Sequence, residues 1–195
     1  MNRLQTTVFL LLCTAAVQAQ TVSNVKTECV QIGGVCWATR NVAKPGKFAA
    51  KPEKAGKFYQ WNRNKAWSSK GKVKSWDSSY PTGSEWEKAN DPCPAGFRVP
   101  TQTELQTLVA ARSTWTTNYN GTSVAGRVFG SGENTVFFPA AGYRYDNVGT
   151  LHHAGVGGFY WSSAEFNSNF AYYVSFGSVS HFTRNGGLSI RCVAE

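Results

Sequence analysis

The sequence predicts an α+β domain with short strands, one or two helices and high loop content. Three observations support this prediction. Only residues 101–112 place apolar side chains at helical spacing behind a capping signal, whereas many short segments alternate or are rich in aromatic and β-branched residues. Gly, Ser and Asn separate these segments. A hydrophobic content of 42% with 14% aromatic residues is enough for a core in a chain of 195 residues.

The first 19 residues predict a secretory signal peptide, because a positive residue precedes an apolar run and the small-residue cleavage pattern Val17-Gln18-Ala19. The mature chain is then expected to be a single domain, residues 20–195. Cys13 raises the alternative of a lipoprotein anchor, which the bulky Leu12 before it disfavours. The sequence has no apolar run of about 20 residues, so we expect no transmembrane segment. A secreted, periplasmic or cell-surface location follows.

Four cysteines remain after signal removal, and an even number in an exported chain predicts two disulfides. The favoured pairing joins Cys29 to Cys36 around a Gly-Gly turn, and Cys93 to Cys192. The rival pairing joins one of the two early cysteines to Cys192. The sequence contains no C-x-x-C and no Cys/His pairing, so we expect no metal.

The elements follow in order. Residues 26–42 predict a hairpin around Gly33-Gly34, and 58–67 an aromatic strand. Thr101 and Glu104 form a capping box at the start of the helix, with Arg112 in its last turn. Further short strands are expected within residues 124–132, 135–145, 158–163, 171–176 and 188–193.

Positive charge is concentrated in one window of the chain. Residues 40–74 contain 11 Lys and Arg but a single acid, Glu53, while the whole chain has a formal charge of +9. The short repeat KPGKF and KAGKF lies here, at 44–48 and 54–58. A solvated surface explains these lysines, and the alternative is an acidic partner for the Lys-rich segment 44–74. Nucleic acid is not expected as a partner of an exported protein.

Catalytic motifs are not evident. The pair His152 and His153 lies in a Gly-flanked loop, and Ser162-Ser163 has no evident base. The sequence contains no G-x-S-x-G, no H-E-x-x-H and no phosphate loop. We therefore expect neither an enzyme nor a cofactor.

Six ordered motifs carry a family resemblance: GGVCWATRNV, FYQWNR, NDPCPAGFRVPTQTELQTLV, FPAAGYRY, YWSSA and GLSIRCV. Over roughly residues 29–193 the chain resembles the Fibrobacter succinogenes major paralogous domain of exported bacterial proteins, common in Bacteroidetes. The resemblance implies a C-type lectin-like fold, in the branch that also contains the sulfatase-modifying enzymes. The catalytic cysteine pair of those enzymes has no match here, and neither does the Trp-Asn-Asp element of calcium lectins.

The chain also resembles the variable target proteins of diversity-generating retroelements, whose C-terminal region is rewritten at adenines. Rewriting Asn codons in this way never yields Lys, Glu, Gln, Trp or Met. Residues 20–165 contain 30 of these five types in 146 positions, whereas residues 166–190 contain none. About five would be expected from that background. The resemblance therefore implies a diversified ligand-binding surface at residues 166–185.

The middle of the C-terminal stretch has the composition of a binding surface, with aromatics for contact area and Ser and Asn for adaptable hydrogen bonds. Alternation and the resemblance assign Ala171, Tyr172, Val174 and Phe176 to the framework. The expected partner is a protein or glycan ligand, and the alternative function is a structural or adhesive subunit of a bacterial surface assembly. The residues expected to face the ligand are Phe166, Asn167, Asn169, Phe170, Tyr173, Ser175, Ser178, Ser180, His181, Phe182, Thr183 and Asn185.

Overall fold

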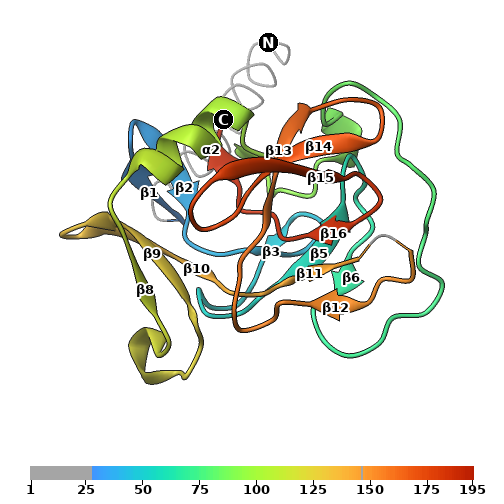
Figure 1. The fold of residues 1–195 in the computed structure, drawn as a ribbon. Helices are drawn as coiled ribbons and strands as arrows, with labels where there is room; N and C mark the ends of the chain where they lie inside the picture. The colour runs from blue at the N-terminus through green and yellow to red at the C-terminus, as the bar shows by residue number, and fades with distance from the viewer. Residues whose placement is uncertain (1–27, 146) are drawn as a thin grey trace, which may run out of the picture.

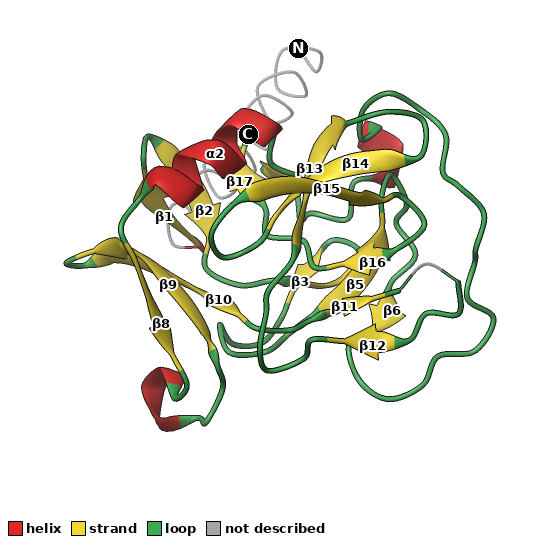
Figure 2. Ribbon diagram, in the orientation of Figure 1, coloured by secondary structure: helices red, strands yellow, loops and turns green. Residues whose placement is uncertain are grey.

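The computed structural model describes residues 28–145 and 147–195, so the expected signal peptide and Cys13 lie outside the described residues (Figure 1). The described part is rich in strands, with one α-helix and two 3-10 helices (Figure 2). The helices are η1 (Lys88–Asn90), α2 (Gln102–Ala110) and η2 (Tyr119–Gly121). The strands are β1 (Cys29–Ile32), β2 (Val35–Ala38), β3 (Val42–Lys44), β4 (Lys47–Phe48), β5 (Lys57–Gln60), β6 (Trp67–Ser68), β7 (Phe97–Arg98), β8 (Ser113–Thr116), β9 (Gly126–Ser131), β10 (Asn134–Pro139), β11 (Tyr143–Arg144), β12 (Leu151–His152), β13 (Tyr160–Glu165), β14 (Phe170–Val174), β15 (Val179–Thr183), β16 (Gly187–Leu188) and β17 (Val193–Ala194). A small α+β architecture is thus confirmed.

The strands of the described residues form several small sheets instead of one large one. Their orders are β1-β2-β17-β7, β10-β9-β8, β12-β11-β16-β5-β6, β13-β14-β15 and β3-β4. β17, at the C-terminal end, pairs with β2 through Val193 and Trp37, and with β7 through Val193 and Arg98. β16 pairs with β5 in the same way. The last part of the chain is therefore attached to the first part through two sheets.

The predicted N-terminal hairpin is confirmed. β1 and β2 pair from Cys29↔Ala38 to Ile32↔Val35, which leaves Gly33 and Gly34 as a two-residue turn. Their φ angles are +59° and +81°, as a type I′ turn requires, so glycine is the suitable residue at both positions. The disulfides are Cys29–Cys36, within this hairpin, and Cys93–Cys192. The favoured pairing is confirmed.

The predicted helix is confirmed with its capping box. Thr101 accepts a hydrogen bond from the Glu104 N–H, and the Glu104 carboxylate accepts one from the Thr101 N–H at 2.7 Å. Leu105 and Leu108 are buried. The helix ends at Ala110, so the placement of Arg112 in its last turn is wrong. No helix within 28–145 and 147–195 is long and apolar enough to cross a membrane.

The capping box should make stability depend on acid pH. Burial alone would raise the pKa of Glu104, but hydrogen bonds from Arg98 and Thr101 outweigh it and lower the pKa below its ordinary value of 4.5. A carboxylate with a depressed pKa stabilises the fold above its unfolded pKa and loses that contribution as pH falls through the folded pKa. We expect Glu104→Gln to lower the free energy of unfolding by about 1 kcal/mol at neutral pH. The difference between Glu104→Gln and the unsubstituted protein should shrink in urea titrations as the pH falls below the ordinary glutamate pKa of 4.5. A difference that stays constant over this range would contradict the assignment.

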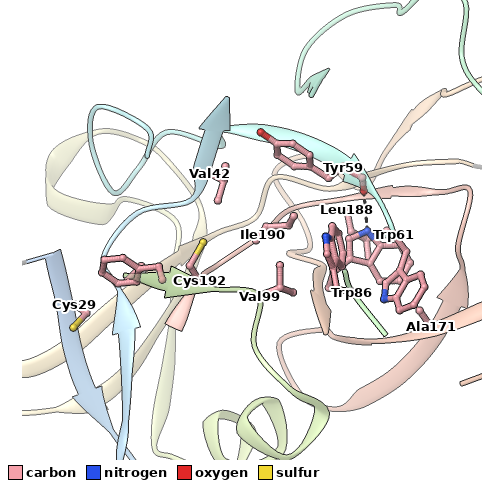
Figure 3. Close-up of a cluster of buried hydrophobic side chains, with 13 residues drawn as sticks. Cys29, Val42, Tyr59, Trp61, Trp86, Val99, Ala171, Leu188, Ile190 and Cys192 are labelled. Carbon is pink, nitrogen blue, oxygen red and sulfur yellow. Dashed lines mark hydrogen bonds between the residues drawn. The ribbon is translucent and has the colours of Figure 1, made fainter. Parts of the chain in front are cut away.

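The interior is built largely from aromatic rings. One cluster contains Trp61, Trp86, Trp161, Leu188 and Ile190, and Figure 3 shows Trp61 and Trp86 next to Leu188 and Ala171. The indole N–H of Trp61 donates to the Ser162 carbonyl at 2.9 Å. The indole N–H of Trp161 donates to the Tyr59 carbonyl at 2.8 Å. These bonds satisfy buried donors and connect β5 to β13, the first strand of the sheet that carries the candidate site.

Three arginines are fully buried, although the sequence does not predict it: Arg144, Arg184 and Arg191. Arg144 donates to backbone carbonyls of Ser68, Lys70, Gly71 and Gly149 at 2.5 to 3.2 Å. Arg191 donates to the carbonyls of Ala38 and Phe137 and to the side-chain oxygen of Asn41. A planar guanidinium with five donors can tie several loops together at once.

Candidate ligand-binding surface

The residues expected to face a ligand lie on and around the sheet β13-β14-β15. The turn at residues 166–169 joins β13 to β14, and the turn at 175–178 joins β14 to β15. In Figure 1 this sheet lies beside α2. It also contacts the β8-β9-β10 sheet, because the Phe176 ring in the β14–β15 turn lies 5.7 Å from the Trp115 ring of β8. Five of the expected residues are exposed, namely Phe166, Asn167, Asn169, Ser178 and His181. Five are half-buried, namely Phe170, Tyr173, Ser175, Ser180 and Phe182.

Thr183 and Asn185 are buried, with exposures of 7% and 4%, and we correct their assignment to the ligand surface. The Thr183 hydroxyl donates to the side-chain oxygen of Asn185 at 2.5 Å, and the Asn185 amide donates to the Ser78 carbonyl at 2.8 Å. Gln60 in turn donates to the Asn185 carbonyl at 2.7 Å. These polar side chains are used to hold the loop around residue 78 against the end of β15. Composition alone could not separate them from exposed Ser and Asn.

Arg184, between these two residues, determines where the 166–169 turn lies. Its guanidinium donates to the carbonyls of Asn167, Ser168 and Gly83 at 3.3, 3.1 and 2.6 Å. It also contacts the Glu165 carboxylate at 3.3 Å and lies 4.0 Å above the Trp61 ring. Burial lowers the pKa of Arg184, and the charge of Glu165 partly opposes this. A buried cation of this kind fixes the base of an exposed turn.

The register places the remaining site residues on both faces of the sheet. Residues directly opposite each other on two antiparallel strands point to the same face of the sheet. The pair Tyr172↔His181 therefore lies on one face, while Ala171↔Phe182 and Tyr173↔Ser180 lie on the other. The expected single surface is thus divided into two groups of rings.

The first group, here called the hairpin rings, consists of Phe166, Phe170, Tyr172 and His181. His181 stacks on Phe166 with centroids 4.2 Å apart and planes 8° from parallel. The Phe170 ring meets His181 edge-on at 5.5 Å, and Tyr172 meets Phe166 edge-on at 5.4 Å. Phe166 is 46% exposed. Tyr172, which we expected in the framework, therefore packs among residues expected to bind.

The second group, here called the central rings, consists of Tyr143, His152, His153, Phe159, Tyr173 and Phe182. Tyr143 stacks on both histidines, with centroid distances of 5.6 and 5.4 Å. It also meets Phe182 edge-on at 5.1 Å. Phe182 lies 6.1 Å from Tyr173. These contacts extend the surface from β14 and β15 onto the β11-β12 hairpin.

The sequence predicts a surface loop for the two histidines and does not connect them to the site. One sequence feature could have linked the histidines to the site. The aromatic segments FPAAGYRY and GFYWSS flank them in the chain. Burial raises the pKa of Tyr143, and the neighbouring hydroxyls of Tyr145 and Tyr173 add to this. Burial likewise raises the pKa of Tyr173, although Ser180 opposes it through a hydrogen bond. Both phenols therefore remain neutral hydrogen-bonding groups at the edge of the ring cluster.

The described residues include no group of three or more His, Cys, Asp or Glu side chains placed to hold a metal ion. The arrangement offers contact area and neutral polar groups. Tyr hydroxyls, imidazoles and serines surround rings whose faces are partly open to solvent. Such a surface is suited to binding, because aromatic rings bury large areas at small entropic cost.

The Lys-rich segment 44–74 forms a separate feature. The second repeat copy lies against the residues just before the first, since the Asn41 amide donates to the Ala55 carbonyl at 3.0 Å and Gly56 lies close to the Val42 carbonyl. Eight of its nine lysines are exposed and Lys57 is half-buried. Among the described residues, none of these lysines forms an ion pair. This leaves a basic surface without internal neutralisation.

Comparison with known proteins identifies the family. The family model described as the Fibrobacter succinogenes major domain matches residues 30–194, which is most of the chain. No curated protein and no solved structure matches. The matched range includes β2 to β17, both ring groups and three of the four paired cysteines. The chain therefore belongs to the Fibrobacter succinogenes major domain family.

Proposed function

We propose that this protein is an exported ligand-binding protein with a C-type lectin-like fold, secreted or displayed on a bacterial surface. Its ligand, a protein or a glycan, would bind at the sheet β13-β14-β15 and the ring groups around it. The two disulfides support export, because such bonds persist mainly in oxidising compartments. The protein would act without a cofactor and without catalysis.

The observation that carries the proposal is an uncharged surface rich in rings on a firmly anchored sheet. Residues 166–183 contain no Asp, Glu, Lys or Arg, in a chain with a formal charge of +9. Surfaces usually keep many charged residues for solubility, so a continuous uncharged stretch with exposed rings favours binding. Arg184 and the Trp61 and Trp161 indoles support this stretch from below.

We further propose that a retroelement diversifies this surface. The absence of Lys, Glu, Gln, Trp and Met from residues 166–190 supports the idea. The burial of residues 183–190 limits tolerated change to positions before Thr183, such as Phe166, Asn169 and His181. Sequencing the genomic locus tests this: a reverse transcriptase gene and a template repeat differing only at adenines are expected. If both are missing, diversification is excluded while ligand binding remains.

A structural or adhesive subunit of a surface assembly is the second candidate. The edge-exposed strands and the basic surface of residues 44–74 favour it, since both could contact neighbouring subunits or an acidic envelope component. Size-exclusion chromatography of the mature chain separates the two functions. A monomer supports the binding protein, and a concentration-dependent polymer supports the subunit.

Single ring removals should distinguish binding residues from packing residues. We expect Phe166→Ala to weaken binding at least about tenfold, with the melting temperature nearly unchanged, because its ring is 46% exposed. Phe182→Ala should instead also lower stability by about 2–3 kcal/mol, since its ring contacts Tyr143, Trp161 and Tyr173. A glycan array and a pull-down with sibling variants supply the ligand, and thermal unfolding supplies the stability. Equal destabilisation by both changes would show that Phe166 is a packing residue.

A further inference from the structure

β15 has an outer edge to which a further strand can be added. In the sheet order β13-β14-β15, β14 occupies one side of β15 only. The pairing of β14 with β15 continues for one hydrogen-bonded residue pair at each end. The Ser175 N–H donates to the Ser178 carbonyl at 2.9 Å, and the Arg184 N–H donates to the Asn169 carbonyl at 2.9 Å. In an antiparallel pair, hydrogen-bonded and non-hydrogen-bonded residue pairs alternate. The pairs Val174↔Val179 and Tyr172↔His181 are therefore the non-hydrogen-bonded ones.

The alternation fixes which backbone groups point outward. The N–H and C=O groups of Val179 and His181 point away from β14, toward the outer edge. No backbone or side-chain group within residues 28–145 and 147–195 hydrogen-bonds to them. The edge ends at Thr183, whose carbonyl accepts from the Gly186 N–H at 2.9 Å. The free edge thus offers two donors and two acceptors at the spacing of a β-strand.

The two ring groups lie on either side of this edge. His181 packs among the hairpin rings on one face, and Phe182 packs among the central rings on the other. A ligand resting on one face alone would miss the other group. An added strand would reach both, because successive side chains of a strand point to opposite faces. Alternate side chains would meet His181 and Phe166, and the intervening ones would meet Phe182.

The absence of charged residues at this edge limits which kind of strand could bind there. Residues 166–183 lack Asp, Glu, Lys and Arg, and the adjoining Arg184 is buried and contacts Glu165. A charged side chain laid over these rings would lose hydration without gaining an opposite charge, and for a cation the cation–π attraction of a ring would offset only part of that loss. The surface is therefore complementary to an uncharged segment, unlike the basic surface of residues 44–74.

We propose that an extended, uncharged peptide segment of a partner protein adds to β15 as a fourth strand of the sheet. Its backbone would bond to Val179 and His181, and its alternate apolar side chains would contact the hairpin rings and the central rings. This mode of recognition is strand addition, in which the backbone gives affinity and the flanking side chains give specificity. The inference rests on the proposed binding function and assigns that function a peptide ligand.

The test compares two substitutions at one position. Peptides are selected on the mature protein from a phage-displayed library of random linear peptides. His181→Ala removes the ring but keeps the outward N–H, whereas His181→Pro removes both and leaves the β14 ladder intact. We expect His181→Pro to bind a selected peptide about tenfold more weakly than His181→Ala. Peptides N-methylated at alternate residues should lose binding in one register and keep it in the other.

Val179→Pro and Val179→Ala provide the same comparison if His181→Pro does not fold. Equal affinities within each Pro/Ala pair, or equal tolerance of N-methylation in both registers, overturn strand addition. Failure to select any peptide, with a glycan still bound on an array, also overturns it but preserves the proposed binding function. Failure of both peptide and glycan probes removes the binding function as well.

Discussion

Replacing Arg191 with alanine should lower the free energy of unfolding by about 3–5 kcal/mol. The side chain is fully buried, and its guanidinium donates to Asn41 at 2.7 and 2.9 Å, to the Ala38 carbonyl at 3.0 Å and to the Phe137 carbonyl at 2.9 Å. It also lies 4.2 Å above the Phe138 ring. Without it, three acceptors stay in the interior with no donor, and each such loss costs about 1–3 kcal/mol. Urea unfolding followed by tryptophan fluorescence measures the change.

Two further variants test whether Arg191 stabilises the fold through the geometry of its hydrogen bonds or through its charge. Arg191→Lys retains the charge but not the planar arrangement of donors, so it should lose most of the same stability. Arg112→Ala removes an exposed arginine and should change stability by about 0.5 kcal/mol or less. If Arg191→Ala costs no more than Arg112→Ala, the hydrogen bonds of Arg191 contribute nothing to the fold.

Local signals explain which parts of this fold were predictable. The capping box of Thr101 and Glu104, and the glycine pair between β1 and β2, act within a few residues, so the sequence reveals them directly. The disulfides followed from an even cysteine count and a short loop. The length of the helix was less accessible, because nothing in the local pattern required it to end at Ala110.

The buried arginines were not predictable, because their acceptors lie far away in the sequence. Arginine is mostly exposed in proteins, and its burial here depends on carbonyls of Phe137 for Arg191 and of Ser68 for Arg144. The same holds for Thr183 and Asn185, which look like binding residues until loop 77–80 covers them. Sequence composition indicates polar side chains but not whether water or protein satisfies them.

The sequence predicts which segment of the chain carries the candidate site, but not which of its side chains share one exposed surface. Alternation separates the side chains of β14 into two sets, but it does not tell which face is open. Here both faces carry half-buried side chains, since α2 packs near Val174 and Val179 on one face and the core cluster with Trp161 packs against Ala171 on the other. The central rings also need β11 and β12, whose positions depend on pairing of Arg144 with Gly187 across the sheet.

Removing the Cys93–Cys192 disulfide should lower the free energy of unfolding by about 4–5 kcal/mol. The bond closes a loop with a sequence separation of 99, so its loss releases much conformational entropy in the unfolded chain. Removal of Cys29–Cys36, with a separation of 7, should cost about 2–3 kcal/mol. Paired Cys→Ala variants compared by urea unfolding give both values under the same conditions.

The comparison between the two disulfides isolates the role of the long loop. Each double variant replaces two sulfurs, so the chemistry is matched and the closed loop differs. Residue 192 precedes β17, which pairs with β2 and β7, and lies just after Ile190 in the core. The long bond therefore stabilises the attachment of the whole C-terminal stretch, including the sheet that carries the ring groups. Equal losses from the two double variants would show that the hydrophobic core and the two sheets already hold this stretch without the covalent link.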